Sequence, residues 1–137
     1  WQIFQEKRAG TMPPIISFIG WHDSGKTTLA SQVVSLLKAR GYRIAVIKST
    51  KESGLRLDRE GTDTHAYRAA GADAVTLVAP DQTVLMSGPS EKRLFHLAHR
   101  YFPDMDLVIG EGFKDERQVA KIEVRRGGAK PLRGAVT

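Results

Sequence analysis

The sequence predicts an α/β fold in which a mostly parallel central sheet carries helices on both faces. Three observations lead to this prediction. Short apolar runs alternate with segments of helical period, which is typical of α/β proteins. A glycine-rich turn separates the first apolar run from the first helical segment. The chain also has 137 residues, which is the size of one domain built around one core.

The first third of the chain predicts a strand–helix–strand unit. Ile15 to Ile19 is a short, mostly apolar run closed by Gly20, which is typical of a buried strand. Lys26 to Arg40 predicts a helix, because its apolar residues repeat at helical spacing and Gly41 follows. Arg43 to Lys48 predicts a second strand. A unit of this length favours parallel pairing of its two strands through a right-handed crossover.

The remaining elements are expected to be shorter. Ser49 to Gly61 is polar and has no hydrophobic period, which predicts a loop. Beyond it, runs of apolar residues predict strands at 73 to 79, 83 to 86, 106 to 109 and 119 to 124. Helical spacing closed by glycine or proline predicts helices at 62 to 70 and 90 to 102. The sequence "PDQ" between the first two of these strands favours a hairpin.

The composition is that of a soluble globular protein, with 41% hydrophobic and 26% charged residues. No apolar run approaches the ~20 residues that a bilayer span needs, so we expect no membrane association. The sequence contains no cysteine, which excludes disulfides, thiolate catalysis and cysteine-based zinc sites and fits a reducing interior. We therefore expect a cytoplasmic protein.

The turn after the first strand has the residues of a phosphate-binding loop. Its glycines, lysine and threonine fit the pattern G-x-x-x-x-G-K-[ST] between a strand and a helix. Glycines let main-chain N–H groups surround a phosphate, and the helix amino terminus adds partial positive charge. Lys26 would reach the outer phosphates, and the Thr27 hydroxyl would complete the ligand shell of Mg²⁺. The candidate phosphate-binding residues are Gly20, Trp21, His22, Asp23, Ser24, Gly25, Lys26, Thr27 and Thr28.

Such a loop needs an acidic partner that holds the Mg²⁺ from the end of a neighbouring strand. Glu111 follows the apolar run "DLVIG", and Gly112 after it permits a close approach to the phosphates. Asp58, in the loop after the second strand, is another candidate metal residue. Each acid has the alternative reading of an ordinary solvated carboxylate. Lys48 ends the second strand at the same sheet edge, which makes it a candidate for contact with phosphate or the metal network.

Several other residues leave alternatives open. His96 and His99 are three apart on a predicted helix, but they have no Glu or Cys companion at ligand spacing, so a surface role is favoured over a metal site. His22 and His65 either meet a ligand or lie on the surface. Trp21 either covers the nucleotide or plugs the loop against the sheet.

The base and the reaction are less well determined than the phosphates. A guanine-reading [NT]KxD segment is not visible, since "TKES" at 50 to 53 lacks the aspartate and follows the wrong strand. Neither an arginine finger nor a water-orienting glutamine stands out, so fast hydrolysis has no evident machinery. We expect slow hydrolysis of a nucleoside triphosphate at most. A small-molecule kinase or ATP-dependent ligase of related fold is the alternative.

The basic residues gather near the end of the sequence. Net charge is +6, and from Lys114 to Arg133 there are seven basic residues against three acidic ones. This balance favours anionic partners or a solvated basic surface. Nucleic acid is the least favoured partner, because the basic stretch lacks aromatic residues for stacking on bases.

Five stretches together resemble a known family. In order from about Ile15 to Arg126, they are "FIGWHDSGKTTL", "VIK", "DREGTDTHAYRAAGA", "DLVIGEGFK" and "AKIEVRR". They are similar to the molybdopterin-guanine dinucleotide biosynthesis adaptor protein B (MobB) family. Many families share the phosphate loop, whereas the acid-Gly-Phe-Lys stretch followed by "AKI" is more specific.

The resemblance implies a P-loop NTPase-like fold that binds GTP and Mg²⁺ through Gly20 to Thr28, a Walker A loop. It also implies that Glu111 takes the Walker B position and that Asp58 lies near the triphosphate. The implied protein is a homodimeric adaptor for the guanylyltransferase MobA, which attaches GMP to molybdopterin, and molybdopterin is itself a candidate ligand. Where relatives often carry "KHTHH", this chain has "KSTKE", so no role follows for those histidines.

The domain organisation follows from the same reading. Residues 1 to 11 precede the first strand and are expected to be an extension or a tag remnant. Residues 12 to 137 are expected to form a single nucleotide-binding domain that is truncated at its carboxyl end, because the family continues there with further strand and helix.

Overall fold

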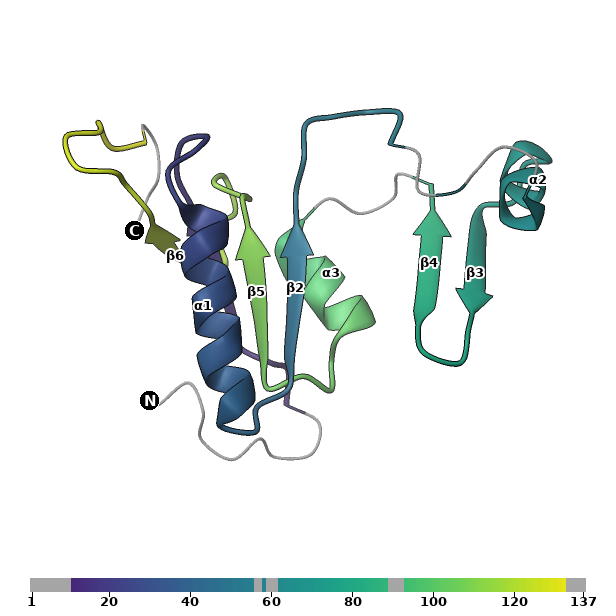
Figure 1. Ribbon diagram of the computed structural model, residues 1–137, viewed down its shortest axis with the longest axis horizontal. Helices are drawn as coiled ribbons and strands as arrows, with labels where there is room; N and C mark the ends of the chain where they lie inside the picture. The colour runs from purple at the N-terminus through teal and green to yellow at the C-terminus, as the bar shows by residue number, and fades with distance from the viewer. Residues whose placement is uncertain (1–10, 56–57, 59–61, 89–92, 133–137) are drawn as a thin grey trace. The chain divides into compact units, whose positions relative to one another are not determined.

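The computed structural model describes residues 11–55, 58, 62–88 and 93–132 (Figure 1). The chain divides into two compact units, one formed by its parts up to Thr50 and from Lys92 onward, the other by Lys51 to Glu91. The single domain expected for residues 12 to 137 stays a prediction, and most of the expected extension, residues 1–10, lies outside the described residues. No helix in the described residues is long and apolar enough to cross a bilayer.

The first unit contains a sheet of four parallel strands in the order β2-β5-β1-β6. These are β1 (Ile15–Ile19), β2 (Ile44–Lys48), β5 (Leu107–Glu111) and β6 (Ala120–Glu123). The sequence favoured direct pairing of β1 with β2, and this is wrong, because β5 lies between them. All five residues of β5 are buried, and a strand with so little polar surface is best accommodated in the middle of a parallel sheet.

Two helices cover opposite faces of this sheet, as predicted. Figure 1 shows α1 (Lys26–Ala39) in front of the strands and α3 (Leu94–Tyr101) behind them. Because side chains alternate along a strand, neighbouring residues of β5 reach different cores. Ile109 packs with Phe18 and Leu37 on the α1 face, and Val108 packs with Leu94 on the α3 face.

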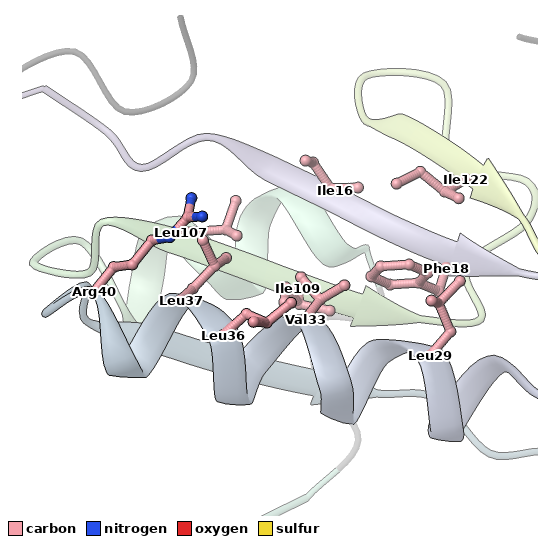
Figure 2. A pocket seen from close by; sticks show the side chains of 10 residues that line it. All are labelled: Ile16, Phe18, Leu29, Val33, Leu36, Leu37, Arg40, Leu107, Ile109 and Ile122. Atoms are coloured by element: carbon pink, nitrogen blue, oxygen red, sulfur yellow. The ribbon is translucent and has the colours of Figure 1, made fainter. Parts of the chain in front are cut away.

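An apolar hollow of about 400 Å³ lies beside α1, between the helix and the strands (Figure 2). Leu36 on the helix and Ile122 on β6 are partly exposed at this hollow. Its lining is apolar apart from Arg40, so it offers few groups that could bind a phosphate. The polar groups of the first unit gather instead at the carboxyl ends of the strands.

The second unit is a helix followed by a hairpin. Its elements are α2 (Asp63–Ala69), β3 (Ala74–Val78) and β4 (Thr83–Ser87), and the two strands pair antiparallel. The predicted hairpin is therefore confirmed. Thr62 begins the helix, since its hydroxyl accepts a hydrogen bond from the main-chain N–H of His65.

The predicted elements are present with small shifts at their ends. The strand predicted to end at Ile109 continues to Glu111, so this acid belongs to β5. The predicted start of the helix at Ser90 lies outside the described residues, and α3 begins at Leu94. In the described part of the polar segment 49 to 61 there is no helix or strand, as expected.

Candidate functional site

The carboxyl ends of the four parallel strands meet at one edge of the sheet. Lys48, the last residue of β2, is in register with Glu111, the last residue of β5. Phe18 of β1 is in register with the same acid, and the glycine-rich loop begins two residues further on. This edge therefore brings together the loop, the acid and the lysine that the sequence placed there from separate parts of the chain.

The backbone of the loop adopts conformations that few residues other than glycine tolerate. Gly20 has φ 156°, Gly25 has φ 95° and Asp23, a residue type that enters the left-handed region more readily than most, has φ 57°. A Cβ on Gly20 would collide with the carbonyl of Val124 and lie 2.7 Å from the Ser24 hydroxyl. The loop can keep this path only with glycine at position 20.

Gly25 is the N-cap residue of α1, and no side chain caps the start of this helix. The first N–H groups of a helix have no acceptor within the helix, and they usually bond to a cap, water or a ligand. The loop therefore points main-chain donors and the positive end of the helix dipole toward the strand ends. These are the features that a bound phosphate requires.

Lys26 lies against the opening of the loop. Its Nζ donates hydrogen bonds to the carbonyl oxygens of Gly20, at 2.9 Å, and Trp21, at 2.8 Å. An ammonium group has three N–H donors, so one remains after these two contacts. The lysine is thus held beside the loop, where it can contribute a positive charge to a bound anion.

Thr27 and Glu111 are 84 residues apart in sequence and in contact in the structure. The Thr27 hydroxyl donates a hydrogen bond of 2.5 Å to Oε1 of Glu111. Glu111 is only 8% exposed, and Thr27 supplies the hydrogen bond that a buried carboxylate needs. A hydroxyl and a carboxylate are the hard oxygen ligands that Mg²⁺ prefers.

Two serines that the sequence analysis did not select hold the turn after β5. The Ser17 hydroxyl donates to the carbonyl of Gly112 at 2.6 Å, and the main-chain N–H of Ser49 donates to the carbonyl of Glu111 at 3.0 Å. Gly112 has φ 94°, and a Cβ there would collide with the Ser49 hydroxyl. Ser17 is the one polar residue of an otherwise apolar strand, a signal that could have identified it.

The other loop residues differ in exposure. Ser24 is buried, and its hydroxyl has no hydrogen-bond partner within the described part of the chain. His22 and Asp23 are exposed, and Nε2 of His22 lies 3.4 Å from Oδ2 of Asp23. Thr28 is exposed on the first turn of α1, where its carbonyl accepts from Ser31.

Trp21 is about half exposed, and its indole N–H donates to the carbonyl of Lys130 at 2.9 Å. It therefore does not plug the loop against the sheet. Contact between this indole and a nucleotide stays a prediction.

Asp58 belongs to the second unit, where its Oδ1 accepts a hydrogen bond of 2.8 Å from Arg68. Its role at a metal stays a prediction. On α3, the His99 ring lies 3.9 Å from the Phe95 ring, centroid to centroid, and His96 is exposed. Within the ranges that the structure describes, no three His, Asp or Glu residues cluster as a metal site.

The residues at this edge fit a magnesium-bound triphosphate. Glycine at positions 20 and 112 lets the main chain pass close to Val124 and Ser49, where a side chain would collide, and the Ser24 hydroxyl is buried with no hydrogen-bond partner in the described part of the chain. Thr27 and Glu111 offer two oxygen ligands, while Lys26 and the start of α1 supply positive charge. These groups are complementary to a polyphosphate with its metal ion.

Residues 15–134 match the sequence model of a family described as molybdopterin guanine dinucleotide synthesis protein B, MobB. The chain belongs to the MobB family. Among its relatives, the molybdopterin-guanine dinucleotide biosynthesis adapter protein of Escherichia coli K12 is 38% identical over 124 residues, which are 87% of this chain and 69% of the relative. The adapter protein of Haemophilus influenzae is 34% identical, over 82% of this chain and 64% of the relative.

Solved MobB structures have the same fold. A crystal structure of molybdopterin-guanine biosynthesis protein B superposes with a TM-score of 0.63 at 31% identity, covering 80% of this chain and 67% of the other. Bacillus subtilis MobB superposes with a TM-score of 0.63 at 21% identity, covering 88% of this chain and 86% of the other. The predicted P-loop NTPase-like α/β fold is thereby confirmed. The chain spans about two thirds of the length of the Escherichia coli and Haemophilus influenzae relatives.

Proposed function

We propose that this MobB-family chain is a GTP-binding adaptor in the biosynthesis of molybdopterin guanine dinucleotide. In this proposal Mg²⁺-GTP binds at the carboxyl edge of the parallel sheet, and the protein assists a guanylyltransferase, MobA, in attaching GMP to molybdopterin. The names of the relatives support the pathway, and the geometry of the loop supports the nucleotide. The cytoplasmic location expected from the sequence is part of the same proposal.

The contact between Thr27 and Glu111 is the observation that carries the nucleotide part. A hydroxyl at the start of α1 and an acid at the end of the adjacent strand are the two protein groups that P-loop proteins place around Mg²⁺. Here they meet directly at 2.5 Å. In the proposed complex the metal would be held between these oxygens and the phosphates, while Lys26 and the main-chain donors of the loop orient the triphosphate.

The adaptor role is favoured over an independent kinase or ligase by the groups around the site. In the first unit, the side-chain hydrogen bonds at the site join Lys26 to its own loop and Thr27 to Glu111. Glu111 is engaged with Thr27, which leaves it poorly placed to act as a base on an acceptor or on water. The proposed protein therefore holds GTP with little turnover of its own.

A homodimer is also part of the proposal, and the second unit supports it. An isolated two-stranded hairpin is marginally stable in water, and this one exposes three large apolar residues, Leu77, Val78 and Leu85. Association with a second copy would remove these side chains from water.

The nucleotide and adaptor parts can be tested separately. Isothermal titration calorimetry with GTP, in the presence and absence of Mg²⁺, should give a stoichiometric complex that the metal strengthens. Purified protein should turn over GTP at well below ~1 per second, alone or with small phosphoacceptors, whereas kinases typically reach 1 to 100 per second. Failure to bind GTP would remove the nucleotide part, and kinase-like turnover would replace the adaptor by the alternative enzyme.

A further inference from the structure

The order of the strands gives the proposed nucleotide site a direction. Glu111 marks the metal side, and it ends β5, which pairs with one edge of β1. β6 pairs with the other edge of β1. In a nucleoside triphosphate the metal binds the outer phosphates, and the base is at the opposite end of the molecule. A nucleotide whose metal lies at Glu111 therefore extends its base toward the side of β6.

The segment that follows β6 is fastened to the phosphate loop. We name it the β6 loop, residues 124–132. Its first residue, Val124, donates from its N–H to the carbonyl of Ile19 at 2.8 Å, and the carbonyl of Lys130 accepts from the Trp21 indole at 2.9 Å. Oε1 of Glu123 accepts from the N–H of Leu132 at 2.7 Å, which closes the loop at its base. The β6 loop is thus bonded to the phosphate loop at Trp21 and to the end of β1 at Ile19, while the third bond closes the loop on itself.

A tight turn shapes the middle of the β6 loop. The N–H of Ala129 donates to the carbonyl of Arg126 at 3.0 Å, and Gly128 between them has φ 80°. A positive φ at this position is typical of a type II turn, which glycine favours. The turn fixes the positions of Arg126, at its start, and of Lys130, just after its end.

The β6 loop carries three cations, of which two have no carboxylate nearby. Nε of Arg125 lies 3.8 Å from Oε2 of Glu123. Arg126 and Lys130 are exposed, and within the part of the chain that the structure describes neither forms an ion pair. The Lys130 carbonyl is committed to Trp21, while its ammonium group and the guanidinium of Arg126 remain available to a ligand at this end of the site.

We propose that the β6 loop reads the guanine base, with Arg126 donating hydrogen bonds to O6 and N7. This inference rests on the proposed GTP binding. Guanine presents two adjacent acceptors on this edge, which match the two parallel donors of a guanidinium. Adenine presents one acceptor and one donor there, so the same arginine leaves an amino group facing a cation. The chain thereby distinguishes the bases without the aspartate of an [NT]KxD segment, which would bind N1–H and the 2-amino group instead.

Nucleotide analogues test this assignment on the unmodified protein. Inosine triphosphate keeps O6 and N7 but lacks the 2-amino group, and 7-deaza-GTP lacks N7. We expect Mg²⁺-ITP to bind within about threefold of Mg²⁺-GTP in calorimetry, and Mg²⁺-ATP and 7-deaza-GTP to bind about tenfold or more weakly, the discrimination that a bidentate contact provides. Strong preference for GTP over ITP, or equal affinity for GTP and ATP, would overturn the proposal.

Two variants test whether the guanine base is recognised by the β6 loop. Arg126→Ala should lower the affinity for GTP about tenfold or more and leave the affinity for ATP nearly unchanged, so that the two nucleotides bind alike. Arg117→Ala removes the same charge from an exposed position between β5 and β6 and should keep the preference for GTP. Equal losses for GTP and ATP in Arg126→Ala would indicate a general charge effect and would overturn base reading.

The two proposals fail in different ways. If no triphosphate binds, the proposed function falls and base reading falls with it. If GTP binds but its preference over ATP does not depend on Arg126, the adaptor proposal stands and only this inference is lost. The thermal unfolding curve of each variant should match that of the unmodified protein, because Arg126 is exposed and contributes only its main chain to the turn.

Discussion

At the scale of single residues, the candidate site depends on a few main-chain and side-chain oxygens. Lys26 donates to two carbonyl oxygens of its own loop, and Thr27 donates to Glu111. None of these side chains packs in either hydrophobic core. Substitutions here should therefore alter ligand binding far more than the free energy of unfolding.

Lys26→Ala tests the phosphate contact. Removing the ammonium group should weaken GTP binding by about tenfold to a hundredfold, the range expected for a hydrogen bond to a charged group. Lys38→Ala removes the same charge from an exposed position on the last turn of the same helix and should leave the affinity unchanged. Calorimetry of both variants checks this, and an unchanged affinity in Lys26→Ala would exclude the loop as the triphosphate site.

Glu111→Gln tests the metal contact. The amide can still accept a hydrogen bond from Thr27, but it no longer offers a negative charge to Mg²⁺. We expect the variant to bind GTP with nearly the same affinity with and without Mg²⁺, whereas the unmodified protein gains affinity with the metal. Asp58→Asn is the comparison, because Asp58 pairs with Arg68 in the second unit. If Asp58→Asn lost the effect of Mg²⁺ and Glu111→Gln kept it, the assignment of the metal to Glu111 would be wrong.

At the scale of elements, β5 organises the first unit. It pairs with β1 and β2 along its two edges, contributes to the cores on both faces of the sheet and ends in Glu111. Gly110 lies near its end, and a Cβ there would collide with Leu94 of α3 and lie 2.8 Å from the Ser17 hydroxyl. The close approach of α3 to the sheet thus depends on a glycine one residue before the proposed metal ligand.

Gly110→Ala should destabilise the protein by about 1–3 kcal/mol, since an added methyl group in a packed interior forces its neighbours to move. The midpoint of urea unfolding, followed by circular dichroism, measures this change. Gly127→Ala is the matched control, because no atom lies within 4 Å of the position that its Cβ would occupy. Equal midpoints for the two variants would show that α3 can shift away from β5 without cost.

The elements also show how far the sequence could be interpreted. Ile15–Ile19 was predicted with its exact bounds, because a continuous apolar run followed by glycine has few other readings. The pairing of β1 with β2 was wrong, because sequence order favours neighbours along the chain. The strand between them is β5, which begins about 60 residues after β2 ends. It takes the central place because all of its residues are buried.

At the scale of the whole molecule, the two units differ in how much apolar surface they bury. The first unit has two cores, one on each face of its sheet. In the second unit Met86 is buried, while Leu77, Val78 and Leu85 remain largely exposed. In the proposed homodimer, the hairpin would gain apolar contacts beyond those that the second unit makes within itself.

Val78→Lys tests this association. Val78 is 75% exposed, so the lysine should be tolerated in a monomer but should oppose a second apolar surface. Sedimentation velocity should show a dimer for the unmodified protein and at least a tenfold weaker association for the variant. Leu36→Lys, an exposed apolar position on α1, should leave the dimer intact. Dissociation by Leu36→Lys instead would place the interface on the first unit.

The sequence by itself determined the class of fold and the place of the glycine-rich loop between the first strand and its helix, because these depend on local spacing and on glycine and lysine at fixed positions. Only the tertiary structure decided which strand lies between β1 and β2, that Glu111 meets Thr27, and that Ser17 bonds to Gly112 and Trp21 to Lys130. These contacts join residues far apart in the chain, and burial of the whole sheet brings them together rather than any local pattern.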